Sequence, residues 1–206
     1  MTLSAVRSND AALNWKSGAT NLGRNKLFRL QLAQREHDEK YHPEISRLPL
    51  HHRLNHMALH FAKYAGRLAR ALREENGVDV PRTMTDIFII SMSCANALNI
   101  DLGDYLIEEN ISSENTPATA SGRQESQTLQ IELLLDVTDA AGRMAKACET
   151  VDHLEAFPFR EQMSQSTVDL AKISLAYMQS RCMDPADEVF TRLEGVRRKK
   201  IFHGHI

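Results

Sequence analysis

A cluster of histidines is the feature of this sequence best suited to metal chemistry. Its members are His51, His52, His56 and His60. His52, His56 and His60 follow one another at intervals of four, which places them on one face of a helix, where neutral imidazoles can jointly bind a transition metal. A zinc site usually takes a further ligand from a second element, and only His203 and His205 are candidates for it. The pattern is more typical of packed or solvated histidines, so we expect no metal cofactor and keep these three histidines as the alternative site.

Other reactive side chains show no catalytic motif. The sequence contains no Gly-x-Ser-x-Gly turn and no glycine-rich loop ending in lysine. Cys94, Cys148 and Cys182 are widely spaced within apolar helical patterns, so we expect reduced packing residues and not a disulfide framework or a zinc site. Any chemistry must therefore come from charged side chains that the fold brings together.

The elements that would position such side chains occur twice. Ala-Gly-Arg-Leu-Ala-Arg-Ala at 65–71 is matched by Ala-Gly-Arg-Met-Ala-Lys-Ala at 141–147. Further along, three aspartates of the first half match three of the second at one common offset: Asp86, Asp101 and Asp104 with Asp169, Asp184 and Asp187. Self-similarity over this length indicates a duplicated structural unit, and two copies side by side would form a pseudo-dimer within one chain.

The apolar pattern predicts helices and no strands. Apolar residues at steps of three and four form one stripe over 50–73, and the segment 83–98 is apolar on nearly every side, as expected for a central helix. A third helix is expected to begin at Asp101, a good N-cap. The same order follows over 129–149, 159–181 and 184–199, where Asp184 and Pro185 form a strong helix start.

This helix order resembles the MazG-type all-α nucleoside triphosphate pyrophosphohydrolases. The resemblance rests on Ala-Gly-x-Leu-Ala at 65–69, Asp-Ile-Phe-Ile-Ile at 86–90 and Ala-Leu-Asn-Ile-Asp-Leu at 97–102. It covers about 55–106 in the first half and 133–199 in the second, where 169–187 is a weaker counterpart of the motifs in the first half. Enzymes of this family carry a Glu-Glu-x-x-Glu motif and a Glu-x-x-Asp motif on facing helices, whose carboxylates converge on Mg²⁺.

The family motif is degraded in both halves. In the first half its positions fall on Lys63, Tyr64, Arg67, Thr83 and Asp86; in the second they fall on Asp139, Ala140, Arg143, Ser166 and Asp169. An arginine takes the last place of the first motif in each half, and a guanidinium cannot coordinate a metal. The resemblance therefore implies the fold while the residues contradict the chemistry, and only Asp86, Asp139 and Asp169 are left as candidate catalytic acids.

Two interpretations of these positions follow. In the first, Arg67 pairs with Asp86 and Arg143 with Asp169, which would fix the register of adjacent helices. In the second, basic side chains bind a phosphate or nucleotide without hydrolysing it. The candidate ligand-binding residues are Lys63, Arg67, Arg70 and Arg143.

Composition excludes several classes of partner. With 206 residues and a net charge of -2, the chain has no general electrostatic attraction to nucleic acid or anionic lipid. The basic cluster at 197–200 is more typical of cations at a helix C-terminus than of a nucleic-acid contact. No apolar run approaches the roughly 20 residues that span a bilayer, and the first residues lack the apolar core of a secretion signal. We therefore expect a cytoplasmic protein.

The predicted organisation is all-α, with two MazG-like repeats packed as an intramolecular pseudo-dimer. A partly helical extension at 1–45 precedes the first repeat at 46–111, a linker at 112–127 and the second repeat with its basic tail at 128–206. The predicted function is a catalytically degenerate MazG-like protein that binds a nucleotide, a phosphate or a protein partner, which includes a second copy of the chain. The alternative is a divergent Mg²⁺-dependent pyrophosphohydrolase that recruits other acids, such as Glu74, Glu75 or Asp136.

Overall fold

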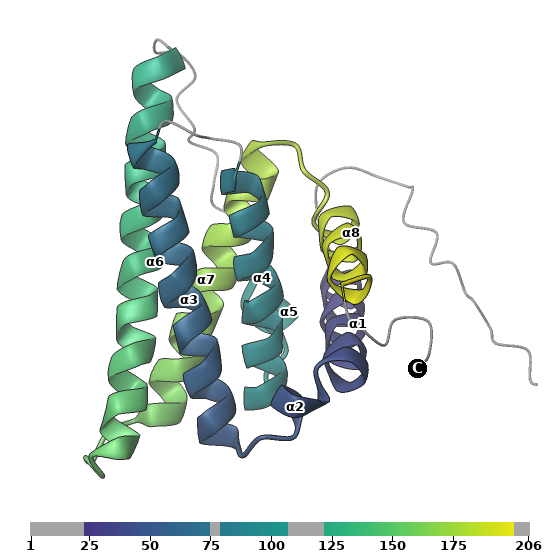
Figure 1. Ribbon diagram of the computed structural model, residues 1–206, viewed down its shortest axis with the longest axis vertical. Coiled ribbons are helices and arrows are strands. Elements are labelled where there is room, and N and C mark those ends of the chain that lie inside the picture. Colours follow the sequence, from purple (N-terminus) through teal and green to yellow (C-terminus); the bar gives the residue numbers. More distant parts are fainter. Residues whose placement is uncertain (1–22, 75–78, 107–121, 200–206) are drawn as a thin grey trace, which may run out of the picture.

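The computed structural model describes residues 23–74, 79–106 and 122–199. Within these ranges the chain forms eight helices and no strand, which confirms the all-α prediction (Figure 1). The helices are α1 (Arg24–Tyr41), α2 (Pro43–Ser46), α3 (Leu50–Arg73), α4 (Asp79–Leu98), α5 (Leu102–Leu106), α6 (Gly122–Asp152), α7 (Phe159–Ser180) and α8 (Pro185–Arg197). None of the described helices combines the length and the apolar character that crossing a membrane requires.

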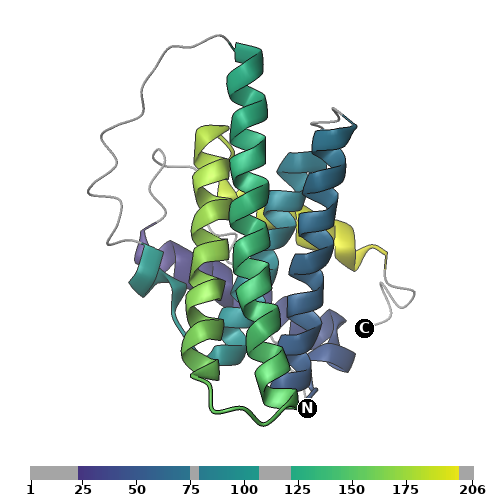
Figure 2. The same ribbon diagram turned by 90° about the vertical axis from the view of Figure 1, so that its left-hand side faces the viewer.

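Four long helices form a bundle. The α3–α4 hairpin and the α6–α7 hairpin lie side by side, with α3 packed on α6 and α4 packed on α7 (Figures 1 and 2). Helices α1 and α8 run across this bundle on the side of α4, as Figure 2 shows most clearly. The result is three layers: α3 with α6, then α4 with α7, then α1, α5 and α8.

The middle layer contacts a core on each side. Buried residues between the two hairpins include Phe61, Ile87, Met144 and Leu170. Buried residues between the middle and outer layers include Leu30, Phe88, Leu102, Val168 and Val189. Helix α4 contributes Ile87 to the first core and Phe88 to the second, so the sequence prediction of a central helix at this position is correct.

The glycines of the repeat do not lie in the contact between the two hairpins, whereas Ala141 does. The sequence suggests that small residues around Gly66 and Gly142 let α3 and α6 approach closely. The helices do pack together, but both glycines are exposed, and a Cβ added to either would meet nothing within 4 Å. Tyr64 and Ala71 are buried in place of Ala65 and Leu72, which the sequence pattern placed in the apolar stripe, so the buried face of α3 is rotated slightly from the predicted one.

Two helix ends repeat the same geometry. Asn99 and Cys182 adopt positive φ angles of 55° and 54° at the ends of α4 and α7. The next residue in each case donates its N–H to a helix carbonyl, Ile100 to Ala95 at 3.0 Å and Met183 to Met178 at 2.9 Å. These are left-handed C-caps. Cys182 is therefore exposed at a turn, contrary to the prediction that it packs in an apolar helix, whereas Cys94 and Cys148 are buried as expected.

Each of these turns leads into an aspartate that caps the next helix. Asp101 Oδ1 accepts from the Gly103 N–H at 2.8 Å, and Asp184 Oδ1 accepts from the Ala186 N–H at 2.9 Å. The two capped helices then pack reciprocally: α5 follows α4 but lies against α7, whereas α8 follows α7 but lies against α4. This exchange places α8 beside the first hairpin.

The segments predicted as a linker and as an N-terminal extension both contain a helix. Helix α6 begins at Gly122, inside the segment 112–127 that was predicted as a linker. Gln124 and Glu125 are good helix formers, and their helix propensity outweighs that of the serines in this segment. The rest of the predicted linker, 112–121, lies outside the described residues. The extension at 1–45, predicted to be partly helical, contains α1, which belongs to the outer layer. A polar network holds it in place, because Asn96 of α4 donates to the Gln31 carbonyl at 3.0 Å and to Gln34 Oε1 at 2.8 Å.

Candidate functional site

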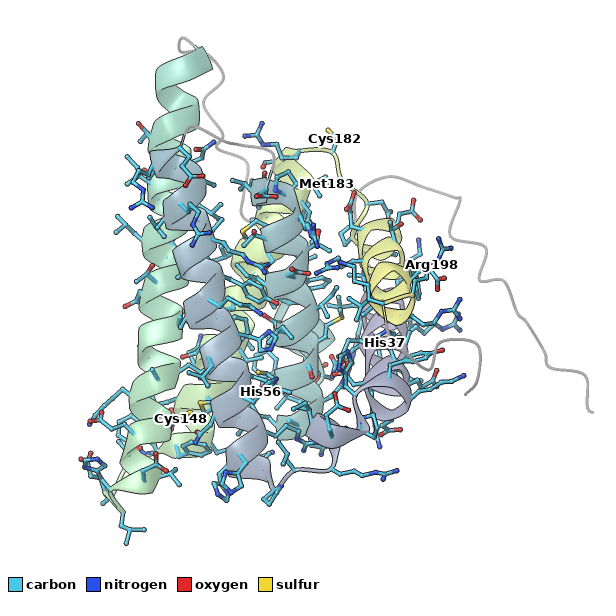
Figure 3. The ribbon with its side chains drawn as sticks, in the orientation of Figure 1. His37, His56, Cys148, Cys182, Met183 and Arg198 are labelled. Atoms are coloured by element: carbon cyan, nitrogen blue, oxygen red, sulfur yellow. The ribbon has the colours of Figure 1, made fainter. Side chains whose placement is uncertain are left out.

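A cavity of about 420 Å³ lies between α3, α4 and the outer helices α1, α2 and α8. Its wall on α3 carries histidines and basic residues, its wall on α4 carries an aspartate, and its far wall is the junction of α1 and α2. Figure 3 shows His56 on α3 and His37 on α1, which line opposite sides of this cavity. The polar lining residues are His37, Asp38, His42, Glu44, His56, His60, Lys63, Tyr64, Arg67, Asp86, Ser93 and Arg192.

Asp86 is a buried carboxylate held by two arginines. Its side chain is 6% exposed, and Arg192 of α8 approaches it as a fork, with Nε 2.5 Å from Oδ1 and NH2 3.2 Å from Oδ2. Arg67 of α3 donates to the same Oδ2 at 3.3 Å. The predicted Arg67–Asp86 pair is therefore confirmed. The hydrogen bonds to Asp86 and its charge raise the pKa of Arg192, so this guanidinium is cationic.

Lys63 adds a third cation to this part of the cavity. It lies one turn from Arg67 on α3, and its Nζ is 4.6 Å from the centre of the Tyr64 ring and 3.0 Å from His60 Nδ1. Burial and the charge of Arg67 lower the pKa of Lys63. Lys63, Arg67 and Arg192 thus face one carboxylate, Asp86, so cations outnumber anions in this part of the cavity, an arrangement that favours the binding of an anion.

His56 and His60 lie within hydrogen-bond distance of each other along α3. Their Nε2 atoms are 3.2 Å apart, and His60 Nδ1 lies 3.2 Å from the Tyr64 hydroxyl. Burial, with the charge of Lys63, lowers the pKa of His60 to about 4. His52 does not belong to this group, because it is exposed and its ring lies against His51 with centroids 3.9 Å apart. The three histidines of the alternative metal site are thus divided, two in the cavity and one outside it.

The far wall contains three possible metal ligands. His37, Asp38 and His42 each offer a ligand atom, and these atoms lie within 4.8 Å of one another. Burial raises the pKa of the Asp38 carboxyl, but His37 and hydrogen bonds donated by Ser93 and Gln34 outweigh burial and lower it. Asp38 is therefore a charged carboxylate inside the cavity.

The second predicted ion pair lies outside this cavity. Arg143 of α6 donates to Asp169 of α7 at 2.8 Å, which confirms the pairing, and to Asp139 on its own helix at 2.9 Å. Asp169 also accepts from Gln165 at 2.8 Å. Arg70 is separated from the cavity too, since it lines a smaller hollow with Asp79 and Arg82. Of the predicted basic residues, Lys63 and Arg67 alone line the cavity.

Six polar residues of the site were not singled out in the sequence: His37, Asp38, His42, Glu44, Ser93 and Arg192. Asp38 and His42 do carry a signal, the same interval of four that marks His56 and His60. Arg192 carries none, because its role arises only when α8 crosses α4.

The fold and the site together define an all-α bundle protein with a charged cavity between the α3–α4 hairpin and helices α1, α2 and α8. No family model, curated protein or solved structure matches the chain.

Proposed function

We propose that the cavity binds a phosphate-bearing anion of the nucleotide class and does not hydrolyse it. The observation that carries this proposal is the convergence of Lys63, Arg67 and Arg192 around one carboxylate, Asp86, at the edge of a partly enclosed space. Arginine and lysine are the side chains that bind phosphate groups through charge-assisted hydrogen bonds. A volume of about 420 Å³ also suits a small ligand.

The hydrogen bonds of Asp86 support binding without hydrolysis. Mg²⁺ requires several oxygen ligands in octahedral geometry and gives up its waters reluctantly. Both oxygens of Asp86 accept hydrogen bonds from guanidinium groups, so a metal at this position would have to displace Arg192 and lie between cations. Asp86 therefore serves as the anchor of the basic cluster in this proposal and not as a metal ligand.

The architecture we propose is a pair of degenerate MazG-like repeats arranged as an intramolecular pseudo-dimer. Three features support it: an Arg–Asp pair within each hairpin, a left-handed turn followed by an aspartate cap after α4 and after α7, and the reciprocal packing of α5 and α8. A duplicated ancestor explains all three, because each feature recurs at matching places in the two halves of the sequence.

A Mg²⁺-dependent nucleotide pyrophosphohydrolase is the second candidate. It is favoured by Asp38 and Glu44, two carboxylates on the wall opposite the basic cluster. Asp139 and Asp169 are outside the cavity lining, so they would not contribute to the same site. This candidate places metal and phosphate at opposite walls of one cavity.

Calorimetric titration with a panel of nucleoside di- and triphosphates, paired with a pyrophosphate-release assay in Mg²⁺, tests the proposal. We expect binding without turnover. The Lys63→Ala variant should bind about tenfold more weakly, the loss of one charged hydrogen bond. Arg143→Ala is the matched control, because it removes a basic residue outside the cavity.

Each outcome of this experiment is informative. Mg²⁺-dependent pyrophosphate release by the unmodified chain would establish the second candidate. Equal affinity of the Lys63→Ala variant and the unmodified chain would contradict the assignment of the anion to this cavity, as would the absence of binding by any nucleotide of the panel.

A further inference from the structure

The junction of α1 and α2 brings two imidazoles and a carboxylate together at the far wall of the cavity. His37 and Asp38 occupy the last turn of α1, and His42 is the single residue between the two helices. The backbone of His42 leaves the helical region, with φ -132° and ψ 46°, and this turn lets its ring approach the end of α1. His37 and His42 have ring centroids 5.8 Å apart.

The hydrogen bonding of His37 leaves one ring nitrogen facing the cluster. Nε2 lies 3.2 Å from the carbonyl oxygen of Leu193, and because a carbonyl can only accept, Nε2 carries the proton. The side chain is 9% exposed, and its Nδ1 is buried with no hydrogen-bond partner in the described part of the chain. This is the arrangement of a metal-ligating histidine, whose second nitrogen usually donates to a carbonyl or carboxylate that fixes the ring.

Asp38 is oriented in a matching way. Its Oδ2 accepts from Gln34 Nε2 at 2.6 Å and from Ser93 Oγ at 2.8 Å. These donors leave Oδ1 directed at His37 Nδ1, 3.6 Å away, too far for a hydrogen bond. A cation between these two atoms, a proton on the ring nitrogen or a metal ion, would be attracted by both of them.

We propose that His37, Asp38 and His42 bind a divalent transition-metal ion, with Zn²⁺ as the probe. Zinc bonds of about 2.0 to 2.2 Å place two tetrahedral ligands about 3.4 Å apart, close to the separation of His37 Nδ1 and Asp38 Oδ1. Two imidazoles with one carboxylate select zinc-class ions over Mg²⁺ or Ca²⁺, which prefer oxygen ligands. This site does not depend on anion binding at Asp86.

Zinc titration of the metal-free full-length chain tests the site. We expect one ion per chain, and at least a tenfold loss of affinity in Asp38→Asn and in His42→Ala. Asp38→Asn keeps the shape of the side chain, and His42→Ala changes a residue outside the helices, so the two variants test the site independently. His51→Ala is the control for surface histidines, since His51 is exposed outside the cavity lining. Far-ultraviolet circular dichroism shows that each variant is folded.

Co²⁺ in place of Zn²⁺ identifies the ligand type. We expect visible absorption bands of a nitrogen- and oxygen-bound ion without sulfur charge transfer, because no cysteine lies in the cluster. Zinc binding that is unchanged in both variants, or lost in His56→Ala and retained in Asp38→Asn, would overturn the proposal. Absence of zinc binding would also overturn it and would indicate that a second proton on His37 satisfies Asp38.

Discussion

Between α3 and α4, two arginines hold one aspartate; between α6 and α7, one arginine holds two aspartates. Asp86 is bound by Arg67 and Arg192 and is 6% exposed, whereas Asp169 shares Arg143 with Asp139 and is 26% exposed. Both sites contain an Arg–Asp pair between the helices of a hairpin. Their surroundings give them opposite net charge.

The residues next to each pair explain the difference. In the matched sequence blocks, Lys63 precedes Arg67 by four residues and Asp139 precedes Arg143 by four, so the neighbouring charge is reversed. The first pair is also covered by α8, which supplies Arg192 and closes one side of the cavity. The same kind of ion pair thus belongs to a mostly basic cluster in the first hairpin and to a mostly acidic one in the second.

Removal of the aspartate from each site should give the largest difference in the free energy of unfolding of the protein. Asp86→Ala leaves two guanidiniums and Lys63 close together without a carboxylate, and we expect a loss of about 3 to 5 kcal/mol in the free energy of unfolding. Asp169→Ala, the matched variant, should cost about 1 kcal/mol, because its pair is partly solvated. Urea denaturation measures both values. Equal losses would show that the burial of Asp86 has no energetic consequence.

Acidification should destabilise the protein through His60, which lies beside the first site and has no counterpart at the second. The folded-state pKa of His60 is about 4, against 6.5 when exposed, so the unfolded chain binds more protons in this window and stability falls as pH drops from 6.5 toward 4. After allowance for solvent screening we expect about 1 to 2 kcal/mol. His60→Gln should remove this part of the pH dependence, most clearly between pH 5 and 6.5, where few carboxylates titrate. A variant with the same slope as the parent chain would refute the assignment to His60.

The smallest effect is expected for the coupling between Arg143 and Asp169. A double-mutant cycle of Arg143→Ala with Asp169→Ala should give about 0.5 to 1 kcal/mol, because the two side chains are 35% and 26% exposed. High salt should reduce this coupling. A coupling above about 3 kcal/mol would place this pair in the same energetic class as the buried one and remove the contrast.

Local signals in the sequence predicted the helices well. The apolar stripe over 50–73 predicted both ends of α3 correctly, and Asp184 with Pro185 predicted the start of α8. The repeat and the family resemblance together placed Arg67 opposite Asp86 and Arg143 opposite Asp169, because each pair joins consecutive helices of a hairpin. Interactions within a hairpin depend on helix period and hairpin order, which a sequence displays.

Interactions between layers could not be predicted in the same way. Arg192 reaches Asp86 only because α8 crosses to the first hairpin, and His37 enters the cavity only because α1 packs on α4. Neither crossing has a periodic signal. The sequence pattern also missed the burial of Tyr64, which lines the cavity that α3 shares with α4 and α8.

Exchange of the two differing charges tests the central claim most directly. Lys63→Asp gives the first site the charge of the second, and Asp139→Lys does the reverse at the control site. Calorimetric titration with pyrophosphate should show binding to the unmodified chain, at least a tenfold loss in Lys63→Asp, and affinity within about twofold of the parent in Asp139→Lys. Unchanged affinity in Lys63→Asp, or no binding by the unmodified chain, would contradict an anion site at Asp86.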